Sequence, residues 1–294
     1  MIKNMFFAVL ALSIFATSCS SDDDNSPTTS DLTLNFSGLE DLGSDFVYEG
    51  WIIVDGSPVS TGRFSNIIFP QTFEVDAAQL ANATTFVLTI EPTIDPDPTP
   101  AATKLLIGDF SGNSANVDSN GTVGDFSKAT GKYILATPTD TDTTNESSGI
   151  WFLDNTNAPP PVAGLDLPVL QDGWKYEGWA VIDGQAISTG TFTKVVGTDD
   201  AAPYSGSVPL PSPNGAEGFF PGEDFLQNAP SGVIFPTDLK GATIVISVEP
   251  SPDNNPGPFT LKPLAHEVPN DAMNNTTITM GTGPVVWLSG SVTR

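Results

Sequence analysis

Apolar side chains in this chain recur in short runs with a period of two, the spacing that places residues on alternate faces of a β-strand. Residues 46–54 are apolar on both faces, as in a strand inside a sandwich, while Phe86, Leu88 and Ile90 alternate with more polar neighbours until Pro92. Beyond residue 30 no long apolar stripe has a spacing of 3.6 residues. The pattern therefore predicts many short strands and no long helix.

The chain contains two copies of one sequence module. The Tyr-Glu-Gly-Trp sequence at 48–51 recurs at 176–179, an offset of 128 residues (48 to 176). An apolar run ending in Glu-Pro at 91–92 recurs at 249–250, an offset of 158 residues (91 to 249). The second copy therefore carries 30 additional residues (158 − 128), and we expect most of 197–232 to form a long surface loop.

Each copy also carries the signals of a β-hairpin. Asp55-Gly56 and its counterpart Asp183-Gly184 supply the two positive-φ positions of a type I′ turn. Gly62 and Gly190, each two residues before a phenylalanine, indicate a bulge or a close backbone approach.

These signals predict an all-β fold of two tandem β-sandwich domains, each of about seven or more short strands. The Pro-rich stretch at 155–164 reads as a stiff linker between them, after a closing strand at 150–153 whose counterpart is 285–288. The predicted organisation is a signal peptide at 1–18, a flexible acidic tether at 19–30, a first sandwich at 31–154, the linker at 155–164, and a second sandwich at 165–294.

The first residues have the features of an export signal peptide. Lys3 precedes an apolar run at 5–15 that is too short to span a bilayer, and small residues lead to Cys19. This resembles the lipobox of bacterial lipoproteins, in which the cysteine is lipidated, although Phe15 and Ala16 stand where Leu is usual. The alternative is a plain secretory signal with a chance cysteine. The acidic run at 22–24 favours display on the outer face of the outer membrane over a merely solvated linker.

Composition narrows the function classes. Asp and Glu outnumber Lys and Arg by 35 to 10, giving a net charge of −25 that disfavours nucleic-acid partners. Cys19 is the sole cysteine, so neither an internal disulfide nor a thiolate zinc site is expected, and no cofactor is implied. His266, the one histidine, has no counterpart in the first copy, where residue 107 or 108 would fall, so we expect no catalytic role for it.

Two kinds of recurring polar residue remain as candidates. Paired carboxylates could hydrolyse glycosides, and the acidic residues that recur are Glu49, Glu91, Glu177 and Glu249. The loops at 91–98 and 249–256 are rich in Asp, Asn and Pro, which suits Ca²⁺ but suits ordinary turns better. The tryptophans at 51, 174 and 179 are expected in the core.

The repeated arrangement resembles the carboxy-terminal domain of anti-sigma-K factors. The shared elements in order are a Trp strand, a glycine turn, a Gly-x-Phe strand and an apolar strand ending in Glu-Pro, here Trp51, Asp55-Gly56, Gly62-Arg63-Phe64 and Leu88–Pro92, then Trp179, Gly190-Thr191-Phe192 and Val248-Glu249-Pro250. The resemblance implies an extracytoplasmic sandwich for sensing or binding. The family's cytoplasmic segment and membrane helix have no counterpart in this sequence, so inhibition of a sigma factor is not carried over.

The sequence thus favours a non-enzymatic, lipid-anchored outer-membrane protein, exposed at the cell surface, that binds, senses or scaffolds. Its expected partners are the membrane, through the lipid on Cys19, and an envelope protein or glycan of unknown identity. Two alternatives stay open. One is a carboxylate-based hydrolase of extracellular polysaccharide, and the other is an extracytoplasmic component of an anti-sigma circuit.

Overall fold

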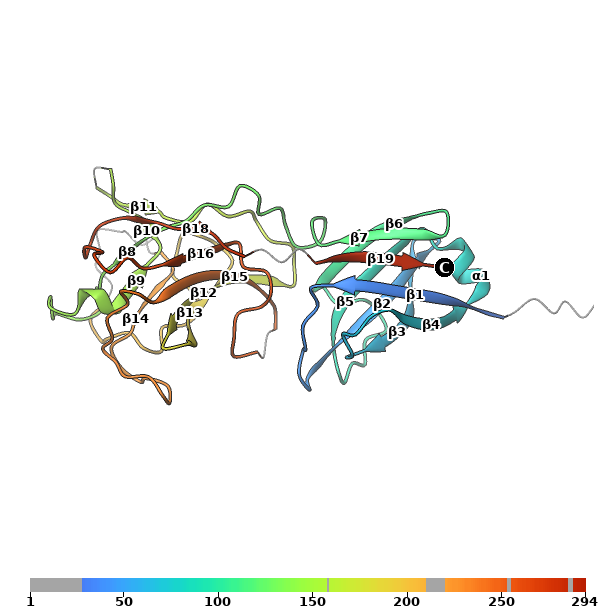
Figure 1. The fold of residues 1–294 in the computed structure, drawn as a ribbon, viewed down its shortest axis with the longest axis horizontal. Coiled ribbons are helices and arrows are strands. Elements are labelled where there is room, and N and C mark those ends of the chain that lie inside the picture. The colour runs from blue at the N-terminus through green and yellow to red at the C-terminus, as the bar shows by residue number, and fades with distance from the viewer. Residues whose placement is uncertain (1–27, 158, 210–219, 253–254, 285–287) are drawn as a thin grey trace, which may run out of the picture.

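The computed structural model describes residues 28–157, 159–209, 220–252, 255–284 and 288–294. Within these ranges the regular secondary structure is almost entirely β-strand, with one short α-helix, α1 (Ala77–Asn82), and one 3-10 turn, η1 (Glu146–Ser148) (Figure 1). The predicted all-β class is confirmed. None of the described helices has the length and apolar character needed to cross a membrane. The predicted signal peptide, Cys19 and most of the tether lie outside the described residues.

The first region is one eight-stranded antiparallel sheet in the order β3-β2-β5-β6-β7-β19-β1-β4. Its strands are β1 (Thr29–Ser37), β2 (Phe46–Val54), β3 (Ser57–Phe64), β4 (Gln71–Asp76), β5 (Thr85–Pro92), β6 (Lys104–Ser111), β7 (Ser114–Asp118) and β19 (Ser289–Thr293). The sheet curls until its edge strands meet, since a Cβ on Gly62 in β3 would lie 2.8 Å from the Phe73 ring in β4. Leu34, Tyr48 and Leu88 are fully buried inside the curl.

The second region contains a five-stranded sheet, β13-β12-β15-β16-β18, and a four-stranded sheet, β14-β9-β8-β17. Their bounds are β8 (Lys132–Leu135), β9 (Gly149–Trp151), β12 (Trp174–Ile182), β13 (Gln185–Phe192), β14 (Gly222–Asp224), β15 (Thr243–Pro250), β16 (Leu264–Glu267), β17 (Ile278–Thr279) and β18 (Gly281–Thr282). A two-stranded hairpin, β10 (Leu153–Asp154) with β11 (Val162–Ala163), projects beside them.

The two regions share one strand order. Only Met280 separates β17 from β18, so these two form one interrupted strand that joins the two sheets of the second region. The combined order is then β13-β12-β15-β16-β18/β17-β8-β9-β14, which matches the first region strand for strand. In this alignment β8 corresponds to β19, β9 to β1, and β14 to β4. The internal repeat seen in the sequence is therefore a repeat of topology as well.

The predicted bounds of the second domain, 165–294, are wrong at their C-terminal end. The C-terminal strand β19 does not join the second region but lies between β7 and β1, with Val292 opposite Ala115 and Leu34. The chain leaves the first region after β7, builds the second region from β8 to β18, and returns with β19 (Figure 1). Strand pairing is a long-range property, and nothing local to 289–293 specifies which sheet that strand enters.

Four further expectations need correction. The strand at 149–151 does not close the first copy, because β9 pairs with β8 and β14 inside the second region. The predicted linker at 155–164 contains β11, and the last two residues of the predicted tether begin β1. The predicted surface loop at 197–232 contains β14, a completely buried strand whose sequence Gly-Glu-Asp carries no apolar alternation to reveal it.

The predicted hairpin signals are confirmed in both copies. The φ angles are 50° and 76° at Asp55 and Gly56, and 50° and 82° at Asp183 and Gly184, the positive pairs of a type I′ turn. The register shifts opposite Gly50 and Gly178, so that one threonine, 61 or 189, bulges out of each second strand. Consequently the strands β2, β3 and β5 can be compared residue by residue with β12, β13 and β15.

Candidate functional site

A buried chain of hydrogen bonds lies on the face of β2 and β5 opposite the core residues. Trp51 Nε1 donates to Thr89 Oγ1 at 2.9 Å, and Thr89 Oγ1 donates to Glu91 Oε1 at 2.5 Å. The backbone N–H of Ala101, in the loop that follows β5, donates to the same carboxylate oxygen at 2.8 Å. Burial raises the pKa of Glu91, although these hydrogen bonds act in the opposite direction.

The same chain of hydrogen bonds occurs in the second region. Trp179 Nε1 donates to Ser247 Oγ at 2.7 Å, and Ser247 donates in turn to Glu249. The backbone N–H of Phe259, again in the loop after the strand, donates to Glu249 Oε1 at 2.9 Å. The expectation that Trp51 and Trp179 are buried is confirmed, since each is 3% exposed. Their indoles are held in place by hydroxyl groups that in turn hold a carboxylate.

A second carboxylate accompanies each chain. Glu49 and Glu177 are buried on β2 and β12, and each accepts a hydrogen bond from a serine on the next strand, Ser60 or Ser188. Glu177 pairs in register with Ser247, so that Glu249, two residues along, is its diagonal neighbour on one face of the sheet. The structure thus brings together the recurring glutamates named from the sequence, two in each region.

Arg63 occupies the space beside the carboxylates of the first region. Its Nε lies 3.3 Å from Glu49 Oε2, an ion pair with a buried partner. The same guanidinium donates to the carbonyl oxygens of Pro92 and Thr93, the latter at 3.2 Å, where the chain leaves β5. One planar cation therefore joins a carboxylate on β2 to two carbonyl groups after β5.

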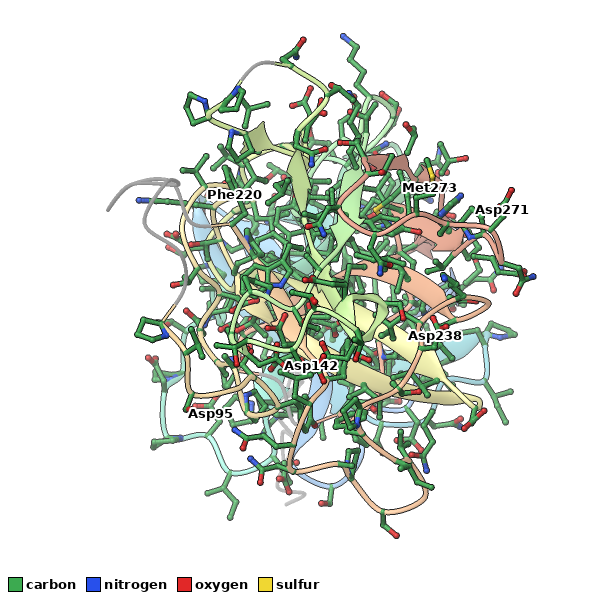
Figure 2. The ribbon with its side chains drawn as sticks, turned by 90° about the vertical axis from the view of Figure 1, so that its left-hand side faces the viewer. Asp95, Asp142, Phe220, Asp238, Asp271 and Met273 are labelled. Carbon is green, nitrogen blue, oxygen red and sulfur yellow. The ribbon has the colours of Figure 1, made fainter. Side chains whose placement is uncertain are left out.

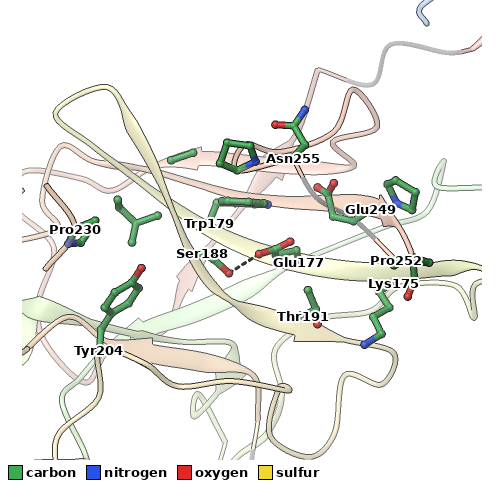
Figure 3. Close-up of a pocket in the computed structure, with 15 residues that line it drawn as sticks. Lys175, Glu177, Trp179, Ser188, Thr191, Tyr204, Pro230, Glu249, Pro252 and Asn255 are labelled. Carbon is green, nitrogen blue, oxygen red and sulfur yellow. Dashed lines mark hydrogen bonds between the residues drawn. The ribbon is translucent and has the colours of Figure 1, made fainter. Parts of the chain in front are cut away.

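The second region has an open cavity at the corresponding place. Thr191 stands where Arg63 stands in the first copy, at the offset of 128 residues. The cavity has a volume of about 680 Å³, and both Glu177 and Glu249 line it (Figure 3). Tyr204 and Pro230, which the inserted segment supplies, line one end, while Lys175 and Pro252 line the other. A volume in this range is typical of small-molecule and cofactor pockets.

The cavity contains one basic side chain. The Lys175 amino group lies 2.5 Å from Asp200 Oδ2, which also accepts a hydrogen bond from Thr191 Oγ1 at 2.9 Å. This ion pair lowers the pKa of Asp200. Lys175 lies at one end of the cavity, close to Thr191 (Figure 3).

Three further acidic residues that the sequence analysis did not single out form a cluster behind this cavity. Burial raises the pKa of Asp199 to about 8, that of Glu223 to about 7 and that of Asp224 to about 6. Glu223 Oε2 accepts a hydrogen bond from the backbone N–H of Tyr204 at 3.3 Å, which connects the cluster to the cavity wall. Asp224 accepts from Trp151 Nε1 at 2.7 Å.

His266 is half-buried on β16. Its Nδ1 lies 2.9 Å from the Tyr133 hydroxyl, and burial lowers the pKa of the imidazole. The neighbour of the ring is thus a phenol, and the geometry gives no Ser-His-Asp relay among the described contacts of this ring.

In their described parts, the acidic loops form ordinary turns. Asp95 Oδ1 accepts from the backbone N–H of Asp97 at 2.9 Å, and Asn255 Oδ1 accepts from that of Gly257 at 3.0 Å. Both are Asx-turns. Within the described ranges no group of three or more His, Cys, Asp or Glu side chains is suited to a metal ion. Other carboxylates, such as Asp142, Asp238 and Asp271, are exposed on loops (Figure 2).

Comparison with known proteins does not assign this site to a family. No protein-family description, no curated protein and no solved structure matches the chain.

Proposed function

We propose that this chain is a lipid-anchored protein of the bacterial cell envelope that binds a ligand, without catalysis, in the cavity of its second region. The proposed address comes from the signal-like segment before Cys19, and the proposed binding role comes from the cavity. One observation carries the binding role: two copies of one hydrogen-bonded network differ in that a side chain of the protein fills the first and an open cavity adjoins the second.

The alternative of a carboxylate-based hydrolase is less well supported. Glu49 and Glu91 in the first region have equivalent hydroxyl partners, with Thr89 where the second region has Ser247, yet Arg63 occupies the space that a substrate would need. The network therefore serves the fold wherever it occurs. An open space beside it adds room for a ligand, and the carboxylates among its described lining residues, Glu177 and Glu249, are the counterparts of the glutamates already present in the first region. The resemblance to anti-sigma-K factors is consistent with the same binding role in an envelope-side sensor.

A panel of soluble envelope polysaccharides and short peptides tests this function. We expect at least one member to bind the wild-type protein, to be recovered chemically unchanged, and to bind at least 10-fold more weakly to Thr191→Arg, which fills the cavity as Arg63 fills its counterpart. Product formation that Glu249→Gln abolishes would establish the hydrolase instead. If every member binds equally to wild type and to Thr191→Arg, the cavity is not the binding site.

A further inference from the structure

In the first region, the place that corresponds to the cavity is occupied by a side chain of the protein itself, Arg63. Arg63 extends from β3 across β2 and places its guanidinium between the Glu49 carboxylate and the carbonyl groups of Pro92 and Thr93. Such a planar group with several N–H donors matches a carboxylate and neighbouring carbonyls better than a point charge does. The occupied copy thus shows which chemistry this framework accepts.

The second region keeps the acceptors of that framework. Glu177 takes the place of Glu49 on β12, held by Ser188 as Glu49 is held by Ser60. Pro250 and Ser251, the counterparts of Pro92 and Thr93, line the cavity. What differs is the side chain that filled the space, since Thr191 is too short to reach across it. The cavity remains open while its polar wall is conserved between the copies.

The remaining walls suit a group with an aliphatic stem. Ile187, Ala186 and Pro230 provide apolar surface, and Trp179 and Tyr204 provide aromatic rings. Cations of the guanidinium type stack on such rings as well as pairing with carboxylates. Among the described lining residues the basic one is Lys175, which pairs with Asp200. The overall charge of −25 also favours the approach of a cation.

We propose that the cavity binds a guanidinium group on an aliphatic stem, the arginine side chain of a partner polypeptide, in the place that Arg63 takes in the first region. This inference rests on the proposed binding function and specifies its ligand. The cavity of about 680 Å³ is larger than one arginine side chain requires, so residues flanking that arginine would also be accommodated.

Calorimetric titration with N-acetyl-arginine N-methylamide tests the inference, with the citrulline analogue as the neutral isostere. We expect saturable binding of the arginine probe and at least 10-fold weaker binding of citrulline, because only the former is charged. Thr191→Arg and Glu177→Gln should each weaken the arginine probe by at least 10-fold. Circular dichroism and melting curves establish that both variants remain folded.

The reciprocal variant makes the test stricter. Arg63→Thr removes the occupant of the first region's site, so a second arginine site should appear there, weaker than the first because the first region lacks the walls that Tyr204 and Pro230 supply. Agmatine, which lacks the amino-acid backbone, separates a small guanidinium ligand from an arginine residue: stronger binding of the blocked amino acid supports a polypeptide partner. Equal binding of agmatine would overturn the polypeptide source, though not the guanidinium chemistry.

Failure of the ligand assignment can be told apart from failure of the binding function. If a neutral panel member binds in a manner lost in Thr191→Arg while the arginine probe does not bind, the guanidinium inference is wrong and the cavity is still a binding site. If the arginine and citrulline probes bind equally, the charge argument is wrong. If no probe or panel member distinguishes wild type from Thr191→Arg, both proposals fail.

Discussion

Deleting residues 289–294 is expected to unfold the first region. The strand they form, β19, lies inside the eight-stranded sheet, and its removal would leave β7 and β1 without the hydrogen-bond partner between them. Val292 is fully buried, and the Arg294 guanidinium donates to the carbonyl oxygens of Leu80 and Ala83 at 2.6 and 2.7 Å. The expected loss is comparable with the whole stability of an ordinary domain, about 5–15 kcal/mol.

Calorimetric unfolding of the truncated chain measures this loss. Thr293→Ser, a change at an exposed position of the same strand, is the matched control and should unfold like wild type. A synthetic peptide of residues 288–294, added in excess, should restore part of the lost transition by adding the missing strand. A truncated chain that melts as wild type does would show that the C-terminal strand is not part of the first sheet.

Stability is expected to fall as the pH rises from about 5 to 9. Asp199, Glu223 and Asp224 have pKa values of about 8, 7 and 6 in the folded chain, against ordinary values of 3.8 for Asp and 4.5 for Glu. Between those limits the folded state holds protons that the unfolded state has released, so the free energy of unfolding decreases with pH. Each pKa unit corresponds to about 1.36 kcal/mol, and the three groups together give a decrease of several kcal/mol.

Denaturant unfolding at a series of pH values checks the sign and the source of this effect. Asp199→Asn removes the group with the largest shift, so its stability should decline less steeply above pH 6 than that of wild type. Asp142→Asn, at an exposed loop position, is the control for the general effect of one fewer negative charge. A protein that becomes more stable from pH 5 to pH 9, or an Asp199→Asn variant with the wild-type slope, would contradict the assignment.

Local signals in the sequence were sufficient for the repeated hairpins and for the apolar strands β2 and β5. The positive φ angles at Asp55-Gly56 and Asp183-Gly184 follow directly from the residue types, and the period-two runs at 46–54 and 86–91 lie in β2 and β5. The return of β19 to the first sheet could not be found in this way, because register and sheet membership depend on contacts far apart in the chain. The sequence Ser-Gly-Ser-Val-Thr at 289–293 is compatible with either sheet.

The sequence alone predicted only part of the candidate site. The glutamates were found because they recur, but their shared face and their hydroxyl partners required the strand register. The difference between Arg63 and Thr191 was also present in the aligned copies, in Gly-Arg-Phe and Gly-Thr-Phe. The significance of this difference depends on the position of the Arg63 guanidinium group, which only the structure gives. The buried acids at 223 and 224 were hidden because β14 has no apolar residue to suggest burial.

The most direct test is a two-dimensional NMR spectrum of the tryptophan indole N–H groups during titration with N-acetyl-arginine N-methylamide. Trp179 lines the open cavity, whereas Trp51 holds the same position in the region filled by Arg63. The indole signal of Trp179, assigned with Trp179→Phe, should shift and saturate while that of Trp51 stays in place. An unmoved Trp179 signal, or equal shifts at both tryptophans, would contradict a guanidinium site confined to the second region.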